Sequence, residues 1–130
     1  MPIRSTRTHQ WHLTVLRDNH FSRREDRLFD AATYIAANAY GEKIVYAGLI
    51  VAVDSTSGKF VPYNASAAYG TGSDTAVGVL DEPYDMTYDD YMVEPVWHGV
   101  LIEDNCYVYG GALGTVPAAV KTALSAILWV

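Results

Sequence analysis

Histidine and acidic side chains near the N-terminus are the first residues in this sequence that could do chemistry. His9, His12 and His20, together with Asp18, offer imidazole and carboxylate groups of the kind that bind transition metals. A His-x-x-His pair suits a helix, but His9 and His12 stand at the start of an alternating segment, where side chains three apart point to opposite faces. We therefore expect no metal site and interpret this region as a solvated segment.

The acidic segment 81–90, with the sequence DEPYDMTYDD, could bind Ca²⁺ through its carboxylates. It lacks the alternating ligand spacing and the central glycine of an EF-hand loop. The pairs Asp89-Asp90 and Glu103-Asp104 could act as paired catalytic carboxylates, but adjacent side chains on a strand point apart. We expect a solubilising surface loop rather than a metal or catalytic site.

Motifs of the common enzyme classes are absent from the sequence. It contains no G-x-S-x-G motif and no Cys/His pair in a recognisable catalytic frame. Gly70-Thr71-Gly72 lacks the third glycine and the following helix of a dinucleotide site. Cys106, the single cysteine, is expected to be a small buried hydrophobic residue. The sequence therefore predicts a protein that is not an enzyme and uses no cofactor.

Composition and charge limit the partners of the chain. Its 130 residues suit one domain, and 50% hydrophobic with 18% charged residues indicates a folded chain. Residues 31–130 contain three lysines against eleven acidic residues, so this part would repel a phosphate backbone and nucleic acid is not expected as a partner. No apolar run approaches the roughly 18 residues that span a bilayer, so no membrane partner is expected either.

The elements that must position these residues are mostly predicted to be strands. The apolar run 44–53 is followed by the polar turn 54–58 and by the run 59–63, which is typical of a β-hairpin. A third strand is expected at 75–80. Two further runs, 96–102 and 106–109, are separated by three polar residues and predict a second hairpin.

The two ends of the chain are less regular. The segment 11–15 alternates apolar and polar residues like an edge strand. Residues 22–39 fit either a helix, with Ser22 and Glu25 as a capping box, or an extended segment, and we favour the extended form. A short C-terminal helix is predicted, with Pro117 in its first turn. The residues expected on one face of that helix are Val120, Leu124, Ile127 and Leu128.

Ten tyrosines and three tryptophans are more aromatic residues than a core of this size needs. Tyr and Trp combine a large apolar face with a polar tip, which is typical of interface residues. Tyr84, Tyr88 and Tyr91 lie in or beside the acidic segment, where burial in the domain's own core is not expected. We predict that they form an interface loop. The alternative is a rim that only shields the sheet.

Four short motifs follow one another within residues 44–80. They are Ala47-Gly48, the turn Gly58-Lys59-Phe60-Val61-Pro62-Tyr63, the loop Gly72-Ser73-Asp74-Thr75 and the strand Ala76-Val77-Gly78-Val79-Leu80. In this order and spacing they resemble the lambda-type head decoration proteins of tailed bacteriophages. The similarity continues more weakly to an Ala-rich C-terminal segment and covers residues 44–128.

The resemblance implies a mainly β fold, a single small β-clip-like or barrel-like domain with an extended N-terminal arm. Proteins of this family sit as trimers at local three-fold positions on the outside of the expanded head. There they hold neighbouring major capsid subunits together against the pressure of packaged DNA. On this interpretation, residues 1–30 form a capsid-contacting arm and residues 31–130 form the decoration domain.

The resemblance also implies which residues meet the capsid. Family arms order on the shell and add to the capsid β-structure, and an alternating segment can do so as an added strand. The arm residues expected to bind in this way are Trp11, Leu13, Val15 and Arg17. The turn residues that carry the family motif are Gly58, Lys59, Pro62 and Tyr63. Deleting residues 1–16 is expected to weaken decoration and to leave the thermal unfolding of the domain nearly unchanged.

The implied partners are the major capsid protein and further copies of the chain in a homotrimer. The implied location is the outer surface of the phage head, after synthesis in the host cytoplasm. A second hypothesis is a small β-domain of a phage tail or baseplate that binds host surface polysaccharide. Stacking of Tyr and Trp on sugars would explain the aromatic residues equally well.

Overall fold

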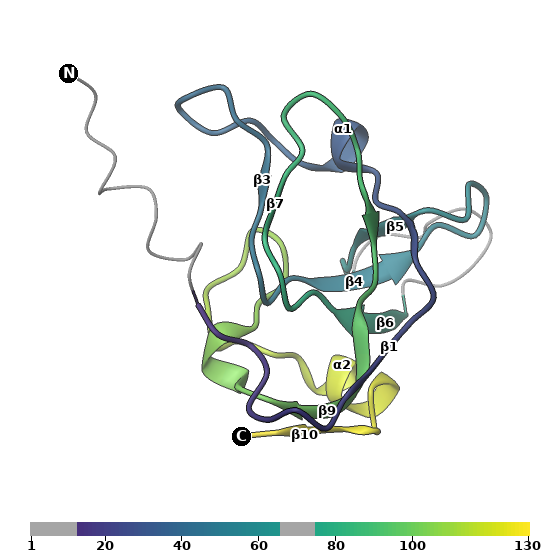
Figure 1. Cartoon of the computed structure of the whole chain (residues 1–130), viewed down its shortest axis with the longest axis vertical. Helices are drawn as coiled ribbons and strands as arrows, with labels where there is room; N and C mark the ends of the chain where they lie inside the picture. Colours follow the sequence, from purple (N-terminus) through teal and green to yellow (C-terminus); the bar gives the residue numbers. More distant parts are fainter. Residues whose placement is uncertain (1–12, 66–74) are drawn as a thin grey trace.

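The computed structural model describes residues 13–65 and 75–130 and confirms a mainly β fold (Figure 1). Strands of two to six residues dominate, and the helices are short. The elements are β1 Ser22–Arg23, β2 Arg27–Leu28, α1 Ala31–Tyr34, β3 Ile44–Val45, β4 Ile50–Val53, β5 Phe60–Pro62, β6 Ala76–Val79, β7 Tyr84–Asp85, β8 Met92–Val93, β9 Val96–Leu101, the 3₁₀ turn η3 Glu103–Asn105, α2 Ala118–Ala123 and β10 Ile127–Trp129.

The main sheet has the strand order β1-β9-β6-β4-β5, and β10 pairs with β9 (Figure 1). The predicted hairpin is confirmed, because β4 and β5 pair antiparallel with Val53 opposite Phe60. Asp54 and Gly58 close its turn through a 2.7 Å backbone hydrogen bond, and Gly58 has φ +74°, which suits glycine. The predicted third strand is β6, which pairs antiparallel with β4.

The apolar run 44–53 forms two strands rather than one. Its first part is β3, which pairs with β7 in a separate two-stranded ladder beside the main sheet (Figure 1). Its second part is β4 in the main sheet. The chain changes direction between them at Gly48, whose φ of +95° is a backbone conformation that other residues rarely adopt.

Strand β4 is buried on both faces, which explains why its sequence is continuously apolar rather than alternating. Ile50 and Ala52 face one hydrophobic core, together with Val79 and Leu101. Val51 faces a second core. The members of that second core include Phe29, Val45, Leu49, Phe60, Leu80, Met86, Val93 and Tyr107. The sheet therefore separates two packed layers, and β4 contributes to both.

The second hairpin predicted at 96–109 is wrong. Strand β9 forms as expected, but the residues after it make the turn η3. Tyr107 then crosses to Leu49, where it forms an isolated parallel bridge and donates its N–H to Gly48 O at 2.9 Å. The chain does not fold back on β9 because Cys106 and Tyr107 are drawn into the two cores.

The predicted C-terminal helix is present as α2, but it ends earlier than expected. Val120 is buried, and Leu124 is the C-cap residue. Ile127 and Leu128 do not continue the helical face, because they belong to β10, which pairs parallel with β9 from Ile127 opposite Gly99 onward. The second half of β9, from Gly99 to Leu101, thereby gains a neighbouring strand from the last residues of the sequence.

The described part of the expected arm, residues 13–30, packs as part of the domain. Val15 and Phe29 are buried, one in each core. The backbone joins the sheet as well: β1 pairs with β9, and β2 pairs with β8. Apolar side chains on both sides of the expected boundary at residue 30 therefore fill the cores.

Residues 22–39 are neither one helix nor wholly extended. The preferred extended form holds for β1 and β2, whereas Ala31–Tyr34 forms one helical turn. Its cap is Asp30, whose side chain accepts a 3.1 Å hydrogen bond from the Thr33 N–H, and not the expected Ser22. Asp90 Oδ1 also accepts from the N–H groups of Ala31 and Ala32, at 3.0 and 3.1 Å. A distant carboxylate thus stabilises this turn.

Cys106 is fully buried, as the sequence predicts, and burial raises the pKa of its thiol to about 12, with a smaller contribution from Glu103. The thiol of the unfolded chain ionises near pH 9, so the unfolding free energy should fall between about pH 9 and pH 12, by on the order of 1.4 kcal/mol per pH unit. The pKa of Tyr107 is also raised by burial and adds to this effect.

Two measurements check this alkaline instability. Urea unfolding from pH 8 to pH 11 should give a steep loss of stability for the wild type and a shallower loss for Cys106→Ala. The native protein should react with a thiol-specific reagent at pH 8 only as fast as it unfolds. Fast stoichiometric labelling of native protein would contradict the buried, neutral thiol.

Candidate functional site

Among the residues described, 13–65 and 75–130, no group of three or more His, Cys, Asp and Glu side chains is arranged to hold a metal ion. No helix in the same residues is long and apolar enough to cross a membrane. His9 and His12 of the histidine cluster, and Trp11 of the arm, lie outside the described residues. Asp18 accepts a 2.9 Å hydrogen bond from the His20 N–H and so stabilises a local turn.

Carboxylates of the acidic segment 81–90 fix the conformation of this segment through hydrogen bonds. Asp85 accepts hydrogen bonds from the backbone N–H and the hydroxyl of Thr87, and Asp90 caps α1. Lys43 N–H donates to Thr87 Oγ1 at 3.0 Å. Met86 is buried in the second core. The segment is therefore an ordered surface loop in which the side chains of Asp85, Met86, Thr87 and Asp90 stabilise the fold.

Three large apolar side chains are exposed in this loop and at the start of β8, and we call them the apolar strip. Tyr88 is 94% exposed, Tyr91 49% and Met92 53%. Tyr84, the third tyrosine of the predicted interface loop, is half-buried rather than exposed, and it lies in β7 opposite Val45. Burial is the main cause that raises the pKa of the Tyr84 hydroxyl, with Glu82 next. The exposed members of the predicted interface are thus Tyr88 and Tyr91, and Met92 joins them.

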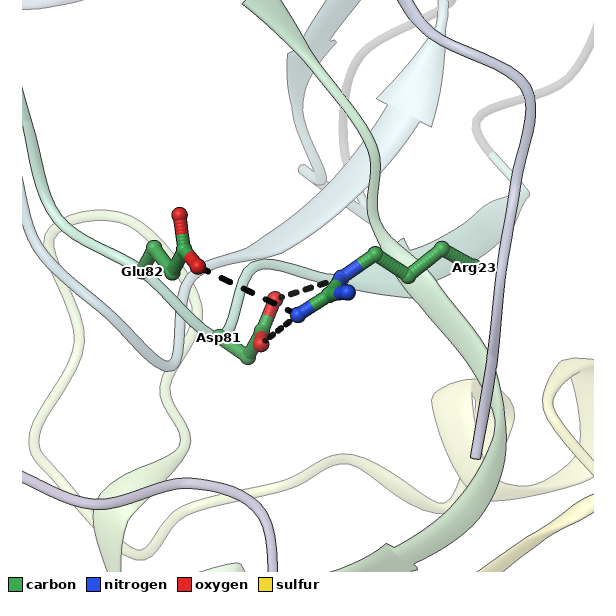
Figure 2. A network of polar contacts seen from close by, with 3 residues as sticks. All are labelled: Arg23, Asp81 and Glu82. Carbon is green, nitrogen blue, oxygen red and sulfur yellow. Dashed lines mark hydrogen bonds and ion pairs between the residues drawn. The ribbon is translucent and has the colours of Figure 1, made fainter. Parts of the chain in front are cut away.

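Arg23 on β1 holds the beginning of the acidic segment to the sheet. Figure 2 shows its guanidinium group facing Asp81 and Glu82. Its Nε and Nη2 atoms both donate to the Asp81 carboxylate, whose side chain is only 9% exposed. This bidentate pair joins residues 58 apart in the sequence, so Arg23 has a structural role.

Arg24 and Arg27 line a hollow of about 470 Å³ on the neighbouring surface, which we call the basic groove. Arg24 Nε donates to Val77 O at 2.9 Å, and its guanidinium carbon lies 5.3 Å from the centre of the Trp97 ring. Arg27 Nη1 donates to Gly58 O at 3.2 Å. The remaining lining residues are Arg23, Glu25, Val53, Phe60, Val77 and Trp97.

Two of the three arginines of the basic groove, Arg24 and Arg27, are held in place without a carboxylate partner in residues 13–65 or 75–130. Their bonds to carbonyl oxygens leave further N–H groups for a ligand, because a guanidinium carries five donors. The sequence interpretation missed this groove and assigned the basic segment to the capsid-contacting arm. The one sequence signal for the groove is the presence of three arginines within residues 23–27. Trp97 and Val77 come to lie beside these arginines only because β1 and β6 pair with β9, which the sequence does not reveal.

A second hollow of about 290 Å³ lies between β3 and the segment after η3. Its walls carry three tyrosines, Tyr46, Tyr107 and Tyr109. The Tyr109 hydroxyl accepts a 2.8 Å hydrogen bond from the Ala36 N–H, which holds this side chain in the lining of the pocket. Asn38 and Glu42 add polar groups to the lining, so this tyrosine pocket combines aromatic faces with hydrogen-bonding side chains.

The residues predicted for strand addition are placed differently from the expectation. The Val15 carbonyl accepts from the Ile102 N–H at 2.8 Å, and the Arg17 N–H donates to Val100 O at 2.9 Å. These backbone groups already pair with β9 and its continuation in the same molecule, and Leu13 is only partly exposed beside them. The folded chain uses these two groups itself, and strand addition to the capsid by this segment stays a prediction.

The motif residues of the turn have structural positions. Gly58 and Lys59 close the β4–β5 turn, where the Asp54 N–H donates to Lys59 O at 2.9 Å. Pro62 lies in β5 opposite Val51, and Tyr63 is buried in the first core. The motif loop 72–75 lies outside the described residues except for Thr75. The turn motif therefore explains a hairpin and does not by itself form a site.

No protein-family model, no curated protein and no solved structure matches this chain. The function is therefore argued from the motifs of the sequence and from the surfaces described above.

Proposed function

We propose that this protein is a structural, non-enzymatic protein of a phage particle that decorates the outside of the expanded head. It binds as homotrimers at local three-fold positions and contacts the major capsid protein. By bridging neighbouring subunits it stabilises the lattice against the internal pressure of the DNA. The resemblance of residues 44–128 to head decoration proteins is the origin of this proposal.

The observation that carries the proposal is the exposed apolar strip of Tyr88, Tyr91 and Met92. Three large apolar side chains exposed within five residues of a small domain are candidates for an interaction surface. The loop that presents them is ordered by its hydrogen bonds to Thr87 and α1, so little conformational entropy is lost when a partner binds. Such a rigid aromatic surface suits a permanent contact on a protein shell.

Mass action gives the physical basis for cementing. A ligand that binds only the expanded lattice stabilises that lattice in proportion to the logarithm of its concentration over its dissociation constant. Three copies joined at a three-fold position add avidity to contacts that are weak one by one. The net charge of −6 also suits a protein displayed on particles that must not aggregate.

The central experiment mixes the purified protein with undecorated heads before and after expansion and measures co-sedimentation. Expanded heads are expected to be coated and compact heads to stay bare, because the spacing at three-fold positions differs between the two shells. Coated heads should then burst at a higher temperature than bare ones. Equal binding to both shells would contradict the cementing mechanism.

A matched pair of variants tests the apolar strip. Tyr91→Ser with Met92→Ser should weaken binding to expanded heads by about tenfold or more, because interface aromatic residues carry much of the binding energy. Leu128→Ser with Val130→Ser removes two comparably exposed residues, 61% and 47%, at β10 on the opposite end of the molecule from the β7–β8 loop (Figure 1). An equal loss of binding to expanded heads for both double variants would show that the apolar strip is not part of the binding surface.

The tyrosine pocket favours one other function, the binding of host surface polysaccharide by a tail or baseplate protein. Aromatic faces beside Asn38 and Glu42 are suitable for sugar rings and their hydroxyl groups. Imaging of particles that carry the protein separates the two functions. Density over the head supports decoration, whereas density on the tail supports polysaccharide binding.

A further inference from the structure

The basic groove is unusual on a chain with a net charge of −6. Arg23 is neutralised by Asp81, and Glu25 lies in the lining, so Arg24 and Arg27 leave the groove with a net positive charge. Trp97 is 36% exposed beside them. Two fixed guanidinium groups next to an indole ring form a site for a segment that carries both a carboxylate and an aromatic ring.

The chain itself displays such a segment at the tip of the β7–β8 loop. Tyr88 is almost fully exposed and Asp89 is exposed, and we call this pair the loop tip. Asp89 forms no ion pair within the described residues, in contrast to Asp81. The residues on either side, Thr87 and Asp90, are anchored by hydrogen bonds to Lys43 and α1. The fold therefore presents the tip as a preformed projection.

We infer that the basic groove of one molecule receives the loop tip of a second copy of this chain. The Asp89 carboxylate pairs with Arg24 or Arg27, and the Tyr88 ring packs against Trp97. Charge complementarity favours this occupant, because the groove presents two guanidinium groups and the tip presents an exposed carboxylate that forms no ion pair within the described residues. The groove volume of about 470 Å³ is within the range of sites that enclose a small ligand.

The geometry of this contact predicts a closed ring or an open chain of copies. The groove lies beside β1 and β6, whereas the tip lies at the α1 end of the molecule (Figure 1). A contact between two different surfaces is heterologous, so it closes into a ring when the rotation between copies allows it. The inference deepens the proposed decoration function. It rests on that function, because decoration brings copies of the chain together on one particle.

Charge reversal in solution tests the contact with the full chain. Sedimentation and NMR titration of the wild type up to about millimolar concentration should show self-association that weakens as salt screens the charges. Arg24→Glu with Arg27→Glu, and separately Asp89→Lys, should each weaken it by about tenfold or more. An equimolar mixture of these two variants should associate again, because the introduced lysine meets the introduced glutamates. Asp104→Lys makes the same charge change on another exposed residue and should have no effect.

Several outcomes would overturn the inference. A wild type that stays monomeric at millimolar concentration, or variants that associate like the wild type, would exclude the contact. Two weakened variants whose mixture does not recover would mean that groove and tip have different occupants. Salt-sensitive binding of an oligonucleotide, lost in the arginine variant while self-association persists, would assign the groove to nucleic acid.

The same proteins separate this inference from the proposed function. If wild type and both variants coat expanded heads equally and none of them self-associates in solution, decoration stands and the contact between copies fails. If the charge-reversed mixture recovers association but no protein coats heads, the contact stands and the decoration function fails.

Discussion

Replacing Gly48 by alanine is expected to destabilise the domain by about 4 kcal/mol or more, enough to prevent stable folding. A Cβ atom at this position would lie 2.0 Å from the Asn105 carbonyl oxygen. The φ of +95° adds the strain of a left-handed conformation. The backbone cannot shift to relieve the overlap, because the Gly48 N–H donates to Leu80 O and its carbonyl accepts from Tyr107.

Gly41→Ala is the matched control for this substitution. Gly41 also has a positive φ, +77°, but no atom lies within 4 Å of the position of an added Cβ. Its cost should be about 1–2 kcal/mol, which is the conformational term alone. Urea unfolding followed by circular dichroism measures both variants. Equal stabilities for the two would show that the approach of Gly48 to Asn105 is not needed by the fold.

Deleting residues 1–16 is expected to make the domain less stable by about 3–5 kcal/mol than deleting residues 1–12, because only the longer deletion removes Val15. Val15 is 1% exposed in the first core. The longer deletion also removes two hydrogen-bond acceptors. The Ile102 N–H loses the Val15 carbonyl, and the Asn105 side chain loses its 2.7 Å bond to Thr14 O. This replaces the sequence-based expectation that the longer deletion leaves unfolding unchanged.

The two deletions also separate what the N-terminal residues contribute to stability from what they contribute to capsid binding. Thermal unfolding of both proteins gives the contribution of residues 13–16. Co-sedimentation of the shorter deletion with expanded heads then tests whether residues 1–12 bind the capsid, with Val15 still in place. Identical unfolding of the two deletions would contradict the packing of Val15. Full coating by the shorter deletion would show that decoration does not need residues 1–12.

Local patterns were sufficient for the elements whose signals are contained in a few consecutive residues. The hairpin of β4 and β5 follows from two apolar runs and a turn that ends in Gly58, and β6, β9 and α2 were predicted in the same way. The burial of Cys106 was also predictable, since an isolated cysteine without a partner behaves as a small hydrophobic residue.

Two of the failures involve contacts between residues far apart in the chain. Tyr107 pairs with Leu49 instead of folding back on β9, and Ile127 joins β9 instead of extending α2. Strands of two or three residues have little intrinsic preference, so the surface against which they pack decides whether and where they form. Sequence periodicity carries no information about that surface.

The features used for the functional proposals also fall into two groups, those that the sequence determines and those that only the tertiary structure determines. The sequence by itself determined the mainly β class, the acidic character and the exposed tyrosines of the β7–β8 loop, because each depends on composition or on short-range pattern. The tertiary structure alone decided that Val15 belongs to the core and that Arg24 lies against Trp97, 73 positions away in the numbering. The reason is physical: burial and charge pairing depend on distances in space, and here those distances are set by the pairing of β1 and β6 with β9.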